Sequence, residues 1–69
     1  MKPLPERAVI PGAAGKKCRI IPAMAPGRYV LFAGGEMLLD HESPKWLSDS
    51  AIGSGALEVR WDFSLVGLG

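Results

Sequence analysis

The segment YVLFAGGEMLLD, residues 29–40, constrains the fold of this chain more than any other. Its two apolar runs flank Gly34 and Gly35, and glycine readily adopts the positive φ angles that a two-residue type I′ turn requires. Short apolar runs on either side of such a pair are typical of two antiparallel strands. The pattern therefore predicts a β-hairpin over residues 28–41.

A two-residue turn also sets the pairing of the two strands. The predicted register places Leu31 opposite Leu38 and Tyr29 opposite Asp40. Because side chains alternate across a strand, this hairpin carries apolar residues on both faces, and both faces need cover. The rest of a 69-residue chain offers little to cover the second face. We therefore expect a second chain to complete that face or an edge of the sheet.

The region before the hairpin is rich in proline, with five of the six prolines in residues 1–27. Each proline lacks a backbone N–H and disfavours helix at the residue before it. Strands that contain proline or end at it suit sheet edges better than sheet centres. We therefore predict an extended basic arm with short edge strands over residues 1–27 and a small β-rich body over residues 28–69, within a single domain.

Two further elements are predicted after the hairpin. Ser43 is a suitable N-cap and Pro44 suits the first helical position, so we expect a short helical turn near residues 44–48, followed by a loop of serine and glycine. Strict alternation of apolar and polar residues predicts a long final strand over residues 56–66 with one face in water. Its apolar face carries Leu57, Val59, Trp61, Phe63 and Leu65. The expected fold is mostly β: a small antiparallel sheet, an open barrel or half of a sandwich.

The small size of the chain limits its stability. A domain of this length hides only about 60% of the surface that its unfolded form exposes. Cys18 is the only cysteine, which excludes an intrachain disulfide, and His41 is the only histidine, which leaves a Cys/His metal site short of ligands. We therefore expect no metal or other cofactor. Oligomerisation or docking onto another protein remains as the source of extra stability.

The residue patterns do not favour catalysis. A Cys18 thiolate with His41 as its base would require the two side chains to meet, and nothing in the sequence brings them together. The stretch PGAAGKK, residues 11–17, is too short for a phosphate-binding loop and lacks the Ser or Thr that holds magnesium. The spacing of four carboxylates matches no calcium loop: Glu36, Asp40, Glu42 and Asp49. We therefore predict a protein that is not an enzyme and has no small-molecule substrate.

Charge is divided unevenly along the chain. Six of the eight Lys and Arg residues lie in residues 1–30, and six of the seven Asp and Glu residues lie in residues 31–69. The basic arm could pack on its own body, lie along the acidic body of a second subunit, or contact nucleic-acid phosphates. The first two arrangements are favoured because the arm has no interleaved aromatic residues and the net charge is only +1.

These features together indicate a noncatalytic structural or assembly protein. We expect it to self-associate or to dock onto a larger assembly, by analogy with small accessory proteins of viral shells and tails. The expected protein interface consists of Tyr29, Leu31, Leu38, Trp46, Trp61 and Phe63. The alternative is a small β-barrel that binds nucleic acid through Lys16, Lys17, Arg19 and Arg28. A third interpretation is a compact inhibitor of a larger enzyme.

The first residues do not resemble a secretory signal, because Lys2 is followed by Pro3 and Pro5 where a signal peptide has a continuous apolar stretch. The longest apolar runs are too short to cross a bilayer. An unpaired cysteine fits a reducing compartment. We therefore expect a location in the cytoplasm, or in a particle assembled there, and no membrane contact.

Overall fold

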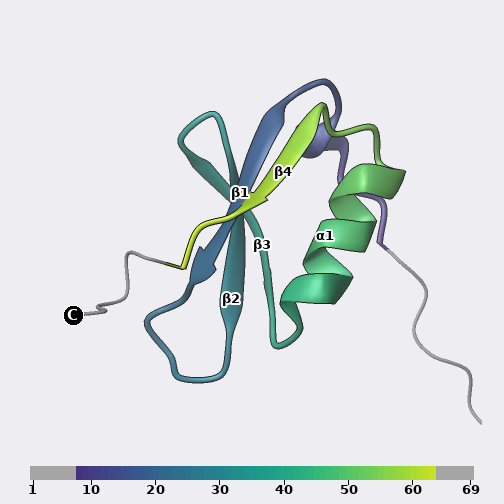
Figure 1. Cartoon of the computed structure of the whole chain (residues 1–69). Helices are drawn as coiled ribbons and strands as arrows, with labels where there is room; N and C mark the ends of the chain where they lie inside the picture. The colour runs from purple at the N-terminus through teal and green to yellow at the C-terminus, as the bar shows by residue number, and fades with distance from the viewer. Residues whose placement is uncertain (1–7, 64–69) are drawn as a thin grey trace, which may run out of the picture.

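The computed structural model describes residues 8–63, which form one open four-stranded sheet with a helix packed on one face (Figure 1). In chain order the elements are a 3-10 turn (Pro11–Ala13), β1 (Lys17–Pro22), β2 (Tyr29–Ala33), β3 (Glu36–His41), α1 (Pro44–Gly53) and β4 (Glu58–Trp61). The strands lie side by side in the order β3-β2-β1-β4. The predicted mostly β fold is thus confirmed, as a sheet that stays open.

The predicted hairpin is formed by β2 and β3. Gly34 and Gly35 at its turn have φ angles of 62° and 79°, which are the positive values that the turn requires. Ala33 faces Glu36 across the turn, as predicted. Local turn chemistry therefore decides the position of the hairpin.

The predicted register is wrong farther from the turn, where a β-bulge shifts the pairing. Leu31 faces Leu39 instead of Leu38, and Tyr29 faces His41. A regular strand would direct Leu38 and Leu39 to opposite faces, whereas both pack against the core here. The bulge thus turns two neighbouring leucines toward the same apolar interior.

The strand β1 was predicted at a sheet edge, but it lies between β2 and β4. Pro22 is its last residue, so the missing N–H falls at the end of the strand and the preceding residues keep their donors. β1 pairs antiparallel with β2 and parallel with β4, so the predicted fully antiparallel sheet is wrong in one pair. The sheet is mixed because α1 forms a long crossover between β3 and β4.

The helix α1 has ten residues, where a short helical turn near residues 44–48 and a loop were predicted. Its predicted start is confirmed, since the Ser43 hydroxyl accepts a hydrogen bond from the Trp46 N–H at 3.1 Å. The helix continues because Leu47 and Ala51, one turn apart, are both fully buried against the sheet. This packing outweighs the low helix propensity of the serines and glycine that follow.

Two serines at the end of α1 hold the chain that precedes the sheet. The Ser50 hydroxyl accepts a hydrogen bond from the Ala8 N–H at 3.1 Å, and the Ser54 hydroxyl accepts one from the Ile10 N–H at 2.8 Å. These bonds satisfy backbone donors and place Ile10 in the core. Residues predicted as a loop are therefore anchors between distant segments.

The core lies between α1 and the face of the sheet that α1 covers. Its buried residues are Ile10, Ala13, Cys18, Ile20, Leu31, Ala33, Leu47 and Ala51. β4 adds only the half-buried Val59, and it is shorter than the strand predicted over residues 56–66, whose last three residues lie outside the described part. Within residues 8–63, α1 lacks the length and apolar character of a membrane-crossing helix.

Candidate protein interface

A series of neighbouring aromatic rings runs over the helix-covered face of the sheet, from the end of β3 to the end of β4. His41 at the end of β3 stacks on Trp46, with ring centroids 4.1 Å apart. The register partner of His41 in β2 is Tyr29, whose ring lies 5.3 Å from that of Phe63. Phe63 in turn lies 5.8 Å from Trp61. We call these five residues the aromatic band.

The aromatic band is covered at one end and open at the other. The three residues nearer β3 are half-buried, whereas Trp61 is 49% exposed and Phe63 is 37% exposed. Leu57, just before β4, is 68% exposed. Large side chains of this kind, grouped on one surface, are typical of protein-binding sites. The open end of the band therefore lies beside the strand at the edge of the sheet.

A groove of about 400 Å³ adjoins this open end. Its lining includes Pro22, Ala25 and Pro26 together with Tyr29 and Phe63. The prolines come from β1 and the loop to β2, a region that the sequence identified only as extended. The surface beside the band is thus concave and mainly apolar, a shape that accommodates an apolar side chain.

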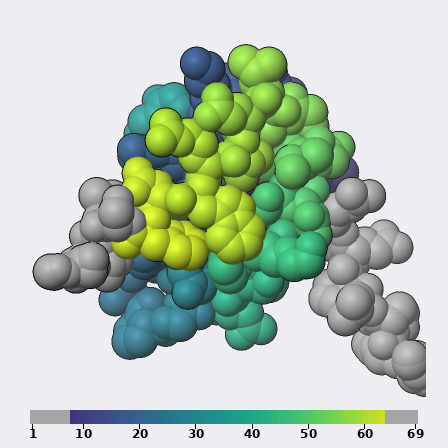
Figure 2. Space-filling model, viewed as in Figure 1, coloured from purple at the N-terminus to yellow at the C-terminus, as the bar shows by residue number. Residues whose placement is uncertain are grey.

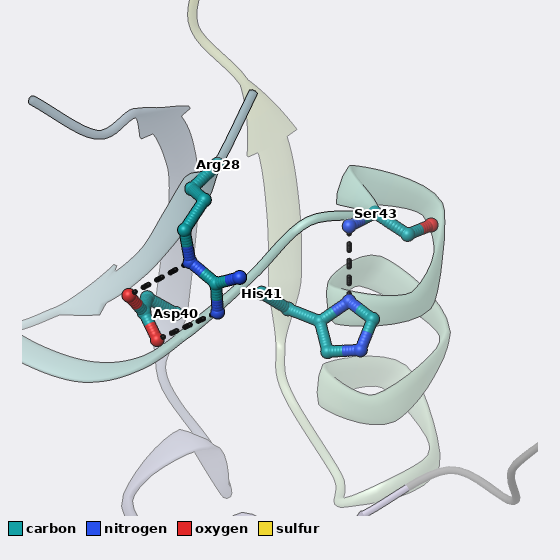
Figure 3. Close-up of polar contacts among 4 residues, drawn as sticks. All are labelled: Arg28, Asp40, His41 and Ser43. Atoms are coloured by element: carbon teal, nitrogen blue, oxygen red, sulfur yellow. Dashed lines mark hydrogen bonds and ion pairs between the residues drawn. The ribbon is translucent and has the colours of Figure 1, made fainter. Parts of the chain in front are cut away.

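His41 holds the start of α1. Figure 3 shows its ring beneath the first turn of the helix, where the Nδ1 atom accepts a hydrogen bond from the Ser43 N–H at 2.9 Å. The indole N–H of Trp46, stacked on this ring, is shielded from solvent and meets no acceptor among residues 8–63. Both residues therefore contribute packing at the covered end of the band.

The six predicted interface residues separate into two groups. Tyr29, Trp61 and Phe63 come together in the aromatic band, and Trp46 joins them through its contact with His41. By contrast, Leu31 is fully buried in the core, and Leu38 in the bulge packs against the core. These two leucines stabilise the fold itself, because α1 and the bulge place them in or against the core.

The opposite face of the sheet is open and mixed in character. One row of register partners crosses all four strands: Met37, Phe32, Arg19 and Arg60. Lys17 and Glu58 form the next row, and with Phe32 they line a shallow depression of about 330 Å³. This face therefore combines an aromatic ring with basic groups.

Two arginines from the first half of the chain form ion pairs with acidic residues. Arg28 makes two hydrogen bonds with Asp40, the shorter at 3.3 Å, as Figure 3 shows. The hydrogen bond and the charge of Asp40 raise the pKa of Arg28 above its ordinary value. Arg19 lies 3.7 Å from Asp62. Basic residues from the first half of the chain are thus paired with acids from the second half.

The four predicted basic contact residues do not form one site. Lys17 and Arg19 share the open face, whereas Arg28 lies beyond the far end of β1, beside Asp40. Lys16 precedes β1, and its carbonyl oxygen accepts backbone hydrogen bonds from Leu57 and Glu58 at the start of β4. Arg60 belongs to the same face and was missed, although its place on the wet face of the predicted final strand was the signal for it.

The structure does not bring Cys18 and His41 together. Cys18 is fully buried in the core, two rows of the sheet away from the register position of His41. Burial raises the pKa of its thiol, and the nearby charge of Lys16 opposes this only in part. Within residues 8–63, His, Cys, Asp and Glu side chains form no cluster of three that could hold a metal ion.

The buried thiol makes stability depend on pH. The unfolded chain loses the Cys18 proton near pH 9.0, whereas the folded chain keeps it to higher pH, so the free energy of unfolding should fall as pH rises above this value. We expect Cys18→Val to remove that loss. Urea unfolding of both proteins from about pH 7 to about pH 10 gives the slope of the free energy of unfolding against pH for each. The difference between the two slopes isolates Cys18, because Lys and Tyr titrate in both proteins. Identical slopes would contradict the assignment.

Comparisons with known proteins identify no relative of this chain. No protein-family model matches it, and neither a curated protein nor a solved structure does so. Its function is therefore inferred from the two surfaces described above.

Proposed function

We propose that this protein is a noncatalytic assembly protein that self-associates or docks onto a larger protein assembly. The observation that supports this proposal is the open end of the aromatic band, where Trp61 and Phe63 are in contact with each other and remain 49% and 37% exposed. Aromatic residues contribute much of the binding energy at protein interfaces. An isolated small domain gains stability when such a surface is covered.

Charge also favours a protein partner. Arg19, Arg28 and Arg60 each lie within 4 Å of a carboxylate of the same chain, at 3.7, 3.3 and 3.9 Å. A surface for phosphates would instead carry a cluster of cations without matching acids. Mixed charge around apolar side chains is the usual composition of a protein interface rim.

The proposal predicts that self-association depends on the aromatic band. The double substitution Trp61→Ser and Phe63→Ser should raise the dissociation constant of the oligomer by about tenfold or more, as expected when two aromatic anchors are lost. Sedimentation velocity over a micromolar concentration series provides the measurement. Ile52→Ser is the matched control, because Ile52 is 59% exposed on α1 and lies outside the band.

A monomer at every concentration would exclude self-association. The proposed function would then be docking onto another protein, including the inhibition of an enzyme. Equal effects of Ile52→Ser and the double substitution would contradict a role for the band. Circular dichroism spectra that match the unmodified protein are required of all variants.

A second candidate function rests on the open face of the sheet. Phe32 lies in one row with Arg19 and Arg60, and Lys17 adjoins them, an arrangement that suits stacking of a single-stranded nucleic acid. Fluorescence anisotropy with a labelled single-stranded oligonucleotide at low salt tests it. Binding that weakens steeply with salt and is lost in Lys17→Glu would favour this candidate. We expect no such binding.

A further inference from the structure

Among residues 8–63, β4 is an edge of the sheet that pairs with β1 on one side and with no strand on the other. Figure 2, viewed as in Figure 1, shows β4 and residues 62–63 on the surface nearest the viewer, where α1 does not cover them. Exposed strand edges pair readily with another strand.

The backbone of β4 has donors available for such pairing. From Glu58 onward the N–H groups alternate: Glu58 and Asp62 donate to carbonyl oxygens of Lys16 and Ile20, at 3.4 and 2.9 Å. Leu57, which precedes the strand, donates to the same Lys16 oxygen at 2.8 Å. Successive N–H groups of a strand point to opposite sides. The N–H groups of Val59 and Trp61 therefore point away from β1, toward the free edge.

The sequence of this edge is complementary to itself. Residues 57–61 read Leu-Glu-Val-Arg-Trp, with opposite charges at equal distances from Val59 and large apolar residues at the two ends. In an antiparallel pair of two such strands centred on Val59, each Glu58 faces an Arg60 of the other copy. Each Trp61 then faces a Leu57, and these residues are 49% and 68% exposed in the single chain.

We propose that β4 pairs antiparallel with β4 of a second copy about a two-fold axis at Val59, which joins the two sheets into one. This inference rests on the proposed self-association and specifies how it occurs. A two-fold axis makes the same surface serve both copies, as in most soluble dimers. Cross-strand partners of opposite charge and large apolar partners both stabilise such a pair.

Charge also selects this register over its neighbours. A strand shifted by two residues keeps its side chains on the same faces but moves the two-fold axis. Centred on Glu58, the pair would set Glu58 against its own copy, and centred on Arg60, it would set Arg60 against its own copy. Like charges directly opposite are destabilising. Of these three arrangements, the one centred on Val59 places unlike charges opposite each other.

The other edge of the sheet, β3, lacks these properties. A two-fold pair centred on Leu38 would set Glu36 of one copy against Asp40 of the other, both acidic. The bulge in the β2–β3 pairing distorts this strand as well. A bulge and like charges placed opposite each other both disfavour strand pairing. Self-association through the sheet is therefore assigned to β4.

Proline at position 59 tests the backbone contact. Val59→Pro removes an N–H that points to the free edge and leaves the N–H donors to β1 in place. We expect the dissociation constant of the dimer to rise about tenfold or more, because a hydrogen-bond donor is lost from each copy. Val59→Ala keeps the N–H and should change it by less than about threefold. Sedimentation equilibrium measures all three proteins, and equal association of the proline and alanine variants would overturn the proposal.

Disulfide formation tests the register independently of the proline variant. Glu58 and Arg60 of two copies would form a non-hydrogen-bonded pair with Cα atoms about 4.5 Å apart, which suits a disulfide. In a Cys18→Val background, mixing Glu58→Cys with Arg60→Cys chains should give a cross-linked heterodimer under mild oxidation. Either variant alone should cross-link far less. Equal cross-linking of the mixture and the separate variants would overturn this register.

The results separate failure of this inference from failure of the proposed function. Self-association that depends on Trp61 and Phe63 but is unaffected by Val59→Pro, with unselective cross-linking, would overturn the β4 pair and preserve the assembly function. A chain that stays monomeric throughout would overturn both the β4 pair and self-association.

Discussion

Replacement of Leu47 by alanine is expected to lower the free energy of unfolding by about 2–5 kcal/mol, the usual cost of truncating a buried leucine. Leu47 is fully buried and lies in the core with Ile20 and Leu31, one from each of the two central strands. It is the largest fully buried residue of α1, so its loss leaves a cavity between the two layers. Small domains have total stabilities near the low end of about 5–15 kcal/mol. The variant should therefore be largely unfolded at moderate temperature.

Urea unfolding followed by tryptophan fluorescence measures this effect. Ile52→Ala is the matched control, because Ile52 is on the same helix but is 59% exposed, and its free energy of unfolding should change by less than about 0.5 kcal/mol. A Leu47→Ala variant as stable as Ile52→Ala would show that α1 does not pack on the sheet as described.

The second large effect is expected at the hairpin turn. Gly34→Val with Gly35→Val should destabilise the fold by about 1–2 kcal/mol per residue, because a side chain with a Cβ atom is strained at positive φ. The φ angles are 62° and 79°, and a Cβ atom at either position would meet nothing within 4 Å. The cost of adding a Cβ atom would therefore come from the backbone conformation and not from contact with other residues.

The control for this prediction is Gly34→Asn, since asparagine followed by glycine is a preferred pair for the same turn. Its melting temperature should stay within a few degrees of that of the unmodified chain, whereas the double valine variant should melt well below it. A double valine variant with unchanged melting would show that the turn is not of this type.

Several features of the fold were predictable because they depend on neighbouring residues. The turn at Gly34 and Gly35 and the helix start at Ser43 each follow from the chemistry of two or three adjacent positions. The length of α1 was not predictable in this way. It depends on Leu47 meeting the sheet and on Ser50 accepting a bond from Ala8, which is 42 residues away.

In the candidate interface, too, some features follow from neighbouring residues and others from distant contacts. Trp61 and Phe63 were recognised from the alternation of the final strand, but their contact with Tyr29 requires the tertiary fold. Alternation indicates which residues share a face, and it does not indicate how much of that face is covered. Leu31 was therefore assigned to the interface, although α1 buries it.

The sequence by itself determined the hairpin, the start of the helix and the residues that share each side of the last strand, because φ preferences, capping and alternation act between neighbours. Only the tertiary structure decided that β1 lies inside the sheet, parallel to β4, and that a bulge turns two leucines inward. Those choices depend on the pairing of residues 17–20 with residues 58–61 and on the packing of α1. Alternative strand arrangements differ in their total buried apolar area and hydrogen bonding, and a local sequence pattern does not encode these totals.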